Sequence, residues 1–134
     1  MRILADTNVM IDYMKRPSEK MIEVFQNEDI IISGVVVSEL FHGAISEKEL
    51  KSLEEDLSVY ECLNIREKDW NEFGRFLYSL RKSGLTVPYP DAIIAFIAIK
   101  NDASVWTNDK HFKLIQAAVE MLILIIHTAL TGLY

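Results

Sequence analysis

Cysteine, proline and long apolar runs are all scarce in this chain of 134 residues. The single cysteine, Cys62, excludes an internal disulfide and fits a reducing compartment. Because Cys62 lies in an apolar segment, we expect it in the core rather than as a nucleophile. The N-terminal apolar run is far too short for a signal peptide, and residues 121–126 fall well below the ~20 residues that span a bilayer. We therefore expect a cytoplasmic protein that does not enter a membrane.

The motifs of several enzyme classes are also missing. The sequence has no glycine-rich phosphate loop, no Gly-x-Ser-x-Gly and no His-Glu-x-x-His. Glu39 and His42 match one Glu-x-x-His half of a di-iron bundle, but the chain has no second copy. The three histidines are scattered, and we expect each of them to be structural: His42, His111 and His127.

Composition leaves the partner open. Half of the residues are apolar and a quarter charged, which predicts one soluble globular domain over residues 1–134. The net charge of −6 argues against nucleic acid, because phosphate backbones attract basic surfaces. However, acids that hold divalent cations count as negative in this sum, and basic residues occur in local groups. These groups are Lys15 with Arg16, Arg75 with Arg81 and Lys82, and Lys110 with Lys113.

Short apolar runs alternate with helical patterns along the whole chain. Strands are expected at residues 3–5, 30–32, 59–63, 104–107 and 121–126. Helices are expected at residues 7–14, 18–25, 35–45, 46–57, 67–82, 92–99 and 109–118. This alternation implies parallel strand pairing, and therefore an α/β fold in which helices flank a central parallel sheet as a three-layer sandwich.

Four acids interrupt the apolar pattern: Asp6, Glu39, Asp91 and Asp109. Asp6 follows the first expected strand, Asp109 follows the fourth, and Glu39 lies one to two turns beyond the second. Asp91 precedes an almost wholly apolar helix whose N-terminus can point at the same edge of the sheet. Ligands gather at the carboxyl ends of parallel strands, so we expect these four side chains to converge.

Each of the three aspartates can also be explained as a simple helix cap. Glu39 resists that explanation because glutamate is a poor cap, and because a charge buried among residues 35–41 would need a counter-ion. Convergent carboxylates without cysteine ligands favour Mg²⁺ or Mn²⁺ over Zn²⁺. A pair of such ions supports hydrolysis of a phosphodiester.

The motifs around these acids together resemble a PIN-domain ribonuclease, and more narrowly the VapC-type toxins of prokaryotic toxin–antitoxin pairs. They are Asp6-Thr7-Asn8, Ser38-Glu39-Leu40, Asp91-Ala92 with Ala95, and Thr107-x-Asp109-x-x-Phe112. They occur in the order typical of the family, from Ile3 to about Ile125. The resemblance implies Mg²⁺- or Mn²⁺-dependent cleavage of RNA (tRNA, rRNA or mRNA), strand order 3-2-1-4-5, a homodimer, and inhibition by a cognate antitoxin.

The resemblance also assigns roles to residues. Asp6 and Asp91 would be the central metal ligands, and Glu39 and Asp109 would complete the site directly or through water. Asn8 would orient Asp6, and Thr107 would hold Asp109 or a substrate phosphate. Two further sets are hypotheses of ours: Arg75, Arg81, Lys82 and Lys110 would hold RNA phosphates, and Met10, Tyr13, Met14, Met21 and Phe25 would face the antitoxin or else form ordinary core.

Three alternatives remain open at this point. A receiver-like module that accepts a phosphoryl group fits poorly, because residue 5 is alanine and no lysine follows Ile126. A catalytically inactive PIN-like module that binds protein or RNA is the second alternative. A related nuclease that acts on DNA is the third.

Overall fold

The computed structural model of the chain describes residues 2–118 and the backbone of residues 123–126. In chain order the elements are β1 (Arg2–Ala5), α1 (Thr7–Lys15), α2 (Glu19–Asn27), β2 (Asp29–Ser33), α3 (Gly34–His42), α4 (Glu47–Leu57), β3 (Glu61–Leu63), the short 3-10 helix η1 (Glu67–Asp69), α5 (Trp70–Lys82), α6 (Tyr89–Lys100), β4 (Ser104–Thr107), α7 (His111–Ala118) and β5 (Ile123–Ile126).

The five strands form one parallel sheet in the order β3-β2-β1-β4-β5, which confirms both the predicted fold class and the predicted order. Strand β1 is central, and its Ile3 lies opposite Ile30 of β2 and Ser104 of β4. Ile3, Leu4 and Ala5 have no exposed surface, as expected for a parallel strand that is covered on both faces.

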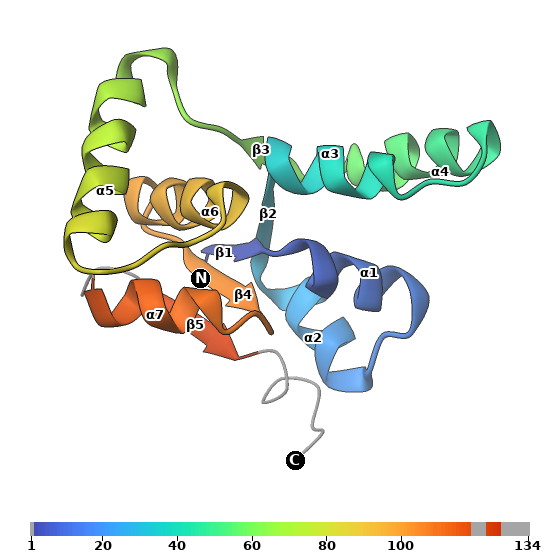
Figure 1. The fold of residues 1–134 in the computed structure, drawn as a ribbon. Helices are drawn as coiled ribbons and strands as arrows, with labels where there is room; N and C mark the ends of the chain where they lie inside the picture. The colour runs from blue at the N-terminus through green and yellow to red at the C-terminus, as the bar shows by residue number, and fades with distance from the viewer. Residues whose placement is uncertain (1, 119–122, 127–134) are drawn as a thin grey trace.

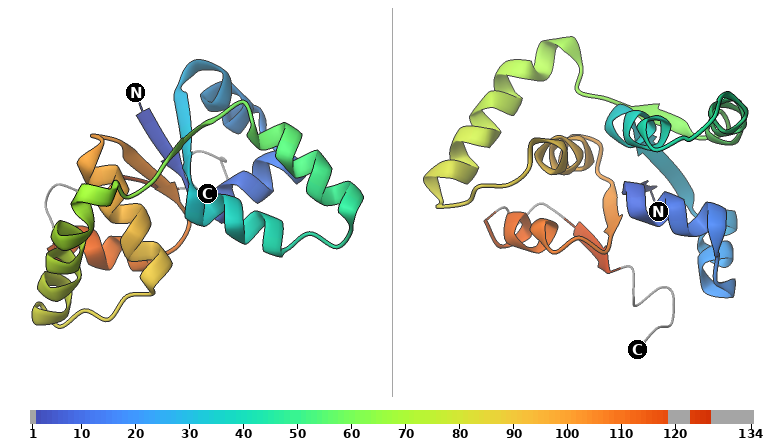
Figure 2. Two further views of the ribbon diagram at one scale, coloured as in Figure 1. Left: turned by 90° about the horizontal axis from the view of Figure 1, so that it is seen from above. Right: turned by 45° about the vertical axis from the view of Figure 1, so that its right-hand side comes forward.

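The strand order explains where the helices lie. The connections from β1 to β2 and from β2 to β3 run across the sheet in one direction. The connections from β3 to β4 and from β4 to β5 run across it in the opposite direction. Because such crossovers are right-handed, α1–α4 and α5–α7 must cover opposite faces of the sheet, as Figures 1 and 2 show. The direction reverses between β1 and β4, and their carboxyl ends therefore border a crevice of the kind in which α/β proteins bind ligands.

Helix α6 anchors one of these layers. Half of its twelve residues are buried, and from Ala92 to Ile99 none is exposed, which confirms the prediction that this apolar stretch lies inside the protein. Phe96 packs against Phe73 of α5 with ring centroids 5.2 Å apart. The helix begins at Tyr89, earlier than predicted, because Pro90 fits the first turn, where no intrahelical bond needs its missing N–H.

Strand β3 differs from the prediction. It covers only Glu61–Leu63 and lies at the edge of the sheet, and Val59 before it is 77% exposed. The expectation that Cys62 is buried was wrong, since Cys62 is exposed on this edge strand. Of the strand predicted at residues 121–126, the structure describes β5; residues 121 and 122 lie outside the described part.

Within the described residues, no helix combines the length and the apolar character that a membrane crossing requires.

Candidate functional site

Asp6 lies directly after β1 and caps α1. It is only 7% exposed, and both of its carboxylate oxygens accept hydrogen bonds. The Thr7 backbone N–H donates to Oδ1 over 2.8 Å, and the Thr107 hydroxyl donates to Oδ2 over 2.8 Å. Asp6 is therefore both a helix cap and a rigidly held carboxylate at the carboxyl end of the central strand.

Glu39 reaches the same place from α3. The Thr7 hydroxyl donates to Glu39 Oε1 over 3.1 Å, so Thr7 contacts both acids. Our expectation that Glu39 is buried was wrong: α3 turns Val36 and Leu40 into the core and leaves Glu39 on its exposed side. Glu39 therefore does not need a counter-ion inside the core. It is a candidate site residue because Thr7 links it to Asp6.

Thr107, the last residue of β4, connects Asp6 with Asp109. Its side chain is buried, and its hydroxyl oxygen accepts the Asp109 N–H over 2.9 Å while it donates to Asp6. Asp109 Oδ1 in turn accepts the backbone N–H of His111 over 2.9 Å, at the start of α7. One hydroxyl thus fixes the positions of two acids that are about a hundred residues apart in the chain.

Asp91 comes to the site from the first turn of α6. It does not cap this helix, because the N-cap position belongs to Pro88 and no side chain makes a capping hydrogen bond there. The simple explanation of Asp91 as a helix cap is therefore wrong. Its side chain is 14% exposed, and its Oδ2 lies 3.1 Å from Nδ1 of His111.

His111 is the residue that sequence reasoning missed. Its Nδ1 lies between two acids, 3.1 Å from Asp91 Oδ2 and 2.9 Å from Asp109 Oδ1. The only signal in the sequence was its place two residues beyond Asp109, at a predicted helix start. That spacing is common in capped helices and does not by itself reveal a side-chain contact with Asp91.

The acids influence one another's ionisation. Burial raises the pKa of Asp6, and repulsion from Asp109 and Glu39 adds to this, against the hydrogen bonds from Thr107 and Thr7. Burial, followed by repulsion from Asp109 and from Asp6, raises the pKa of Asp91 to about 6, although His111 acts in the opposite direction. Among residues 2–118, no lysine or arginine forms an ion pair with any of the four acids. A cation in their midst would remove this repulsion.

The other predicted residues lie around this cluster or away from it. Asn8 is exposed, and the described hydrogen bonds on the Asp6 side chain come from Thr7 and Thr107, so its orienting role stays a prediction. Lys110 is exposed and follows Asp109 directly. The basic residues of α5 (Arg75, Arg81 and Lys82) are exposed on a helix that lies on the far side of α6 from the sheet (Figure 1).

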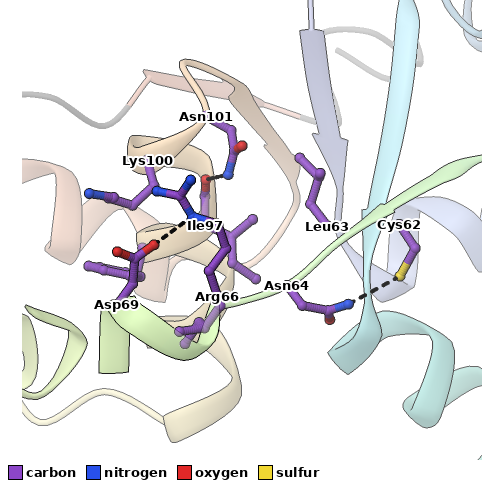
Figure 3. A pocket seen from close by; sticks show the side chains of 10 residues that line it. Cys62, Leu63, Asn64, Arg66, Asp69, Ile97, Lys100 and Asn101 are labelled. Atoms are coloured by element: carbon purple, nitrogen blue, oxygen red, sulfur yellow. Dashed lines mark hydrogen bonds and ion pairs between the residues drawn. The ribbon is translucent and has the colours of Figure 1, made fainter. Parts of the chain in front are cut away.

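A pocket of about 270 Å³ between β3 and α6 includes none of the four acids. Figure 3 shows the ion pair between two of its charged groups: Arg66 Nε lies 2.9 Å from Asp69 Oδ2. Its Lys100 is 2.7 Å from Glu72. Because these charges are already neutralised, this pocket is a weaker candidate than the acidic cluster.

Known proteins resemble this chain over most of its length. The sequence model of the PIN domain matches residues 3–118. Ribonuclease VapC1 of Methanocaldococcus jannaschii is 31% identical over 113 residues, which cover 84% of this chain and 79% of that protein.

Solved structures share the fold. DNA-bound VapBC from Salmonella typhimurium superposes with a TM-score of 0.79 at 24% identity, over 95% of this chain and 98% of that one. VapBC-1 from nontypeable Haemophilus influenzae gives a TM-score of 0.77 at 23% identity, over 96% and 99%. The fold, the converging acids and the match over residues 3–118 agree: this chain belongs to the PIN-domain family.

Proposed function

We propose that this protein is an endoribonuclease that hydrolyses RNA phosphodiester bonds with Mg²⁺ or Mn²⁺. The observation that carries the proposal is the convergence of Asp6, Asp91 and Asp109, whose mutual repulsion and burial raise the pKa of two of them. Carboxylates brought together without a compensating lysine or arginine are stable only with cations or shared protons. The name of the related Ribonuclease VapC1 supports RNA as the substrate.

The donor set fits a divalent metal ion. Asp91, Asp109 and His111 offer ligand atoms that all lie within 4.8 Å of one another, and Asp6 and Glu39 adjoin them through Thr107 and Thr7. Asp6 and Asp91 would hold the metal, and Glu39 and Asp109 would complete its coordination directly or through water. When bound, the metal supplies activation of water and stabilisation of the charge that develops on phosphate oxygens.

The remaining residues position these groups. Thr107 and Thr7 hold the two oxygens of Asp6, so that its lone pairs face a fixed direction. The N-termini of α1 and α6 lie at Asp6 and Asp91, and the positive end of each helix dipole favours an anionic phosphate nearby. Lys110 would contact a phosphate of the RNA, and the α5 residues Arg75, Arg81 and Lys82 would contact more distant ones.

We also propose an antitoxin protein as partner, in a groove beside the site. A hollow of about 560 Å³ is lined by Tyr13, Met14, Pro17, Ile22, Val59 and Tyr60, among others. It shares Met14 and Asp56 with a second hollow, of about 230 Å³, that reaches Glu39. Met10 and Met21 have no exposed surface, so of the two alternatives that we left open for them, ordinary core holds.

The chemistry of this groove defines the partner segment. Many of its lining side chains are apolar, and its charged lining residues are four acids and one lysine: Glu39, Glu49, Glu55, Asp56 and Lys15. A segment with apolar side chains and an arginine or lysine near Glu39 would fit, and would place a cation beside the acids. We further propose a homodimer in the cytoplasm, where RNA is available and the exposed Cys62 stays reduced.

The test is cleavage of a mixed pool of tRNA, rRNA fragments and single-stranded DNA with Mn²⁺ or Mg²⁺. Asp6→Asn and Asp91→Asn should lose cleavage, since each removes one metal-binding charge. Asp102→Asn is the matched control, because Asp102 is exposed and its positive φ of 51° suits asparagine. Intact RNA with tight binding would support an inactive binding module instead, and cleavage of DNA alone would overturn the substrate class.

A further inference from the structure

We propose that His111 Nδ1 is itself a metal ligand, together with Asp91 and Asp109, and that it makes this centre prefer Mn²⁺ to Mg²⁺. This inference rests on the proposed metal-dependent function and adds a nitrogen donor to a site that the four acids alone would fill with oxygen. It concerns a histidine that we expected from its sequence context to be structural.

The spacing of the three donor atoms carries the inference. His111 Nδ1 lies 2.9 Å from Asp109 Oδ1 and 3.1 Å from Asp91 Oδ2. Neighbouring ligands of an octahedral ion with bonds of about 2.1 Å are separated by about 3.0 Å. The two measured distances therefore match adjacent edges of a coordination octahedron as well as they match hydrogen bonds.

The backbone holds His111 in this position. His111 is the first residue of α7, and its N–H donates to Asp109 Oδ1 over 2.9 Å. The next residue, Phe112, is fully buried and anchors the start of the helix. Because the His111 side chain is 40% exposed, solvent and a metal ion can reach the ring without opening the core.

Donor chemistry predicts the selectivity. Mg²⁺ takes oxygen ligands almost exclusively and keeps several of its waters, whereas first-row transition ions accept imidazole nitrogen. A centre of carboxylates alone would discriminate little between Mg²⁺ and Mn²⁺. A nitrogen in the ligand set shifts the balance towards Mn²⁺.

A purely structural histidine would also contact both acids, so the test must report on the bond itself. The full-length protein loaded with Mn²⁺ alone is studied by pulsed electron paramagnetic resonance, in which a coordinated imidazole nitrogen modulates the electron spin echo. The modulation should be present in the wild type and absent in His111→Ala. Variants at the other two histidines, His42→Ala and His127→Ala, are the matched controls and should keep it.

Calorimetric titration with each ion gives a second, independent measurement. His111→Ala should weaken Mn²⁺ binding by at least about tenfold and Mg²⁺ binding by less than about threefold. If His111→Ala fails to fold, isotopic replacement of the histidine nitrogen in the wild type and in both control variants must change the modulation.

The possible failures are distinguishable. Bound Mn²⁺ without nitrogen modulation, or equal weakening of both ions, would overturn the role of His111 and leave the nuclease proposal standing. Absence of Mn²⁺ and Mg²⁺ binding in the wild type would overturn the proposed metal-dependent function as well.

Discussion

Asp69 and Asp91 are two enclosed acids whose surroundings shift their pKa values in opposite directions. Both are at or near the start of a helix and both are largely enclosed, with side chains 11% and 14% exposed. A hydrogen bond from Arg66 Nε, 2.9 Å from Asp69 Oδ2, holds the pKa of Asp69 below its usual value. Burial and two neighbouring carboxylates raise that of Asp91. Enclosure alone therefore does not separate the two acids; the presence of a permanent cation beside Asp69 does.

The largest expected effect contrasts these two residues directly. Asp91→Asn should reduce Mn²⁺ affinity and RNA cleavage by more than the ~100-fold that loss of an outer-shell partner costs, because it removes a ligand charge. Asp69→Asn should leave both unchanged, since Asp69 pairs with Arg66 and is none of the four acids of the cluster. Titration calorimetry measures the Mn²⁺ affinity, and a cleavage assay measures the activity. Equal losses of affinity and cleavage in the two variants would show that Asp91 and Asp69 do not differ in role.

The second prediction concerns pH and stability without metal. The folded protein binds a proton at Asp91 more tightly than the unfolded chain does, so the free energy of unfolding should fall as pH rises from about 4 to about 6, by up to about 3 kcal/mol. Asp91→Asn should remove this loss.

Asp69 should act with the opposite sign. Its lowered pKa contributes stability at neutral pH that disappears as pH falls below its ordinary value of 3.8. Denaturant unfolding at several pH values, with a chelator present, measures both contributions. A stability that rises between pH 4 and 6 in the wild type and in Asp69→Asn alike would contradict the assignment for Asp91.

The third prediction isolates the hydroxyl that joins two acids. Thr107→Val keeps the shape but removes the donor to Asp6 and the acceptor for the Asp109 N–H. Metal affinity should fall by about 10- to 100-fold, and stability by about 1–3 kcal/mol, because the backbone N–H of Asp109 loses its partner. Unchanged metal affinity with reduced stability would make Thr107 a residue of the fold alone.

The smallest effect is expected at Thr7. Thr7→Val removes the 3.1 Å hydrogen bond to Glu39 but keeps the backbone N–H that binds Asp6. Because Glu39 is exposed, solvent replaces most of what is lost, and metal affinity should change by less than about fivefold. A loss as large as that of Thr107→Val would place Glu39 among the central ligands.

The spacing of apolar residues and the positions of helix-capping residues predicted the helices and strands well where these elements are fully buried. Strand β4 has the predicted bounds, and Ser18 and Ser46 cap α2 and α4 as expected. The predictions of burial were wrong for residues whose exposure depends on whether another helix or strand packs over them. Cys62 looks like core in the sequence, but its strand turned out to be an edge, and Glu39 looks buried until the packed face of α3 is known.

For the acidic cluster too, the place of a residue at the end of a strand or the start of a helix could be predicted, but its side-chain contacts could not. Strand ends place Asp6 and Asp109 together in any parallel sheet of this order, and the position of Asp91 at the start of a buried helix predicted that it would join them. The contact between His111 and Asp91 could not be predicted, since it depends on how α7 packs against α6 and on the direction of one ring.

Thr107 also fixes when the site can exist during synthesis. Its bond to Asp6 spans 101 positions and depends on β4 lying in register with β1, where Ala5 pairs with Trp106. A shift of one position would turn the hydroxyl to the opposite face of the sheet. The pairing of Thr107 with Asp6 therefore cannot form until β4 has been synthesised and has docked against β1, so this part of the acidic cluster assembles late in folding.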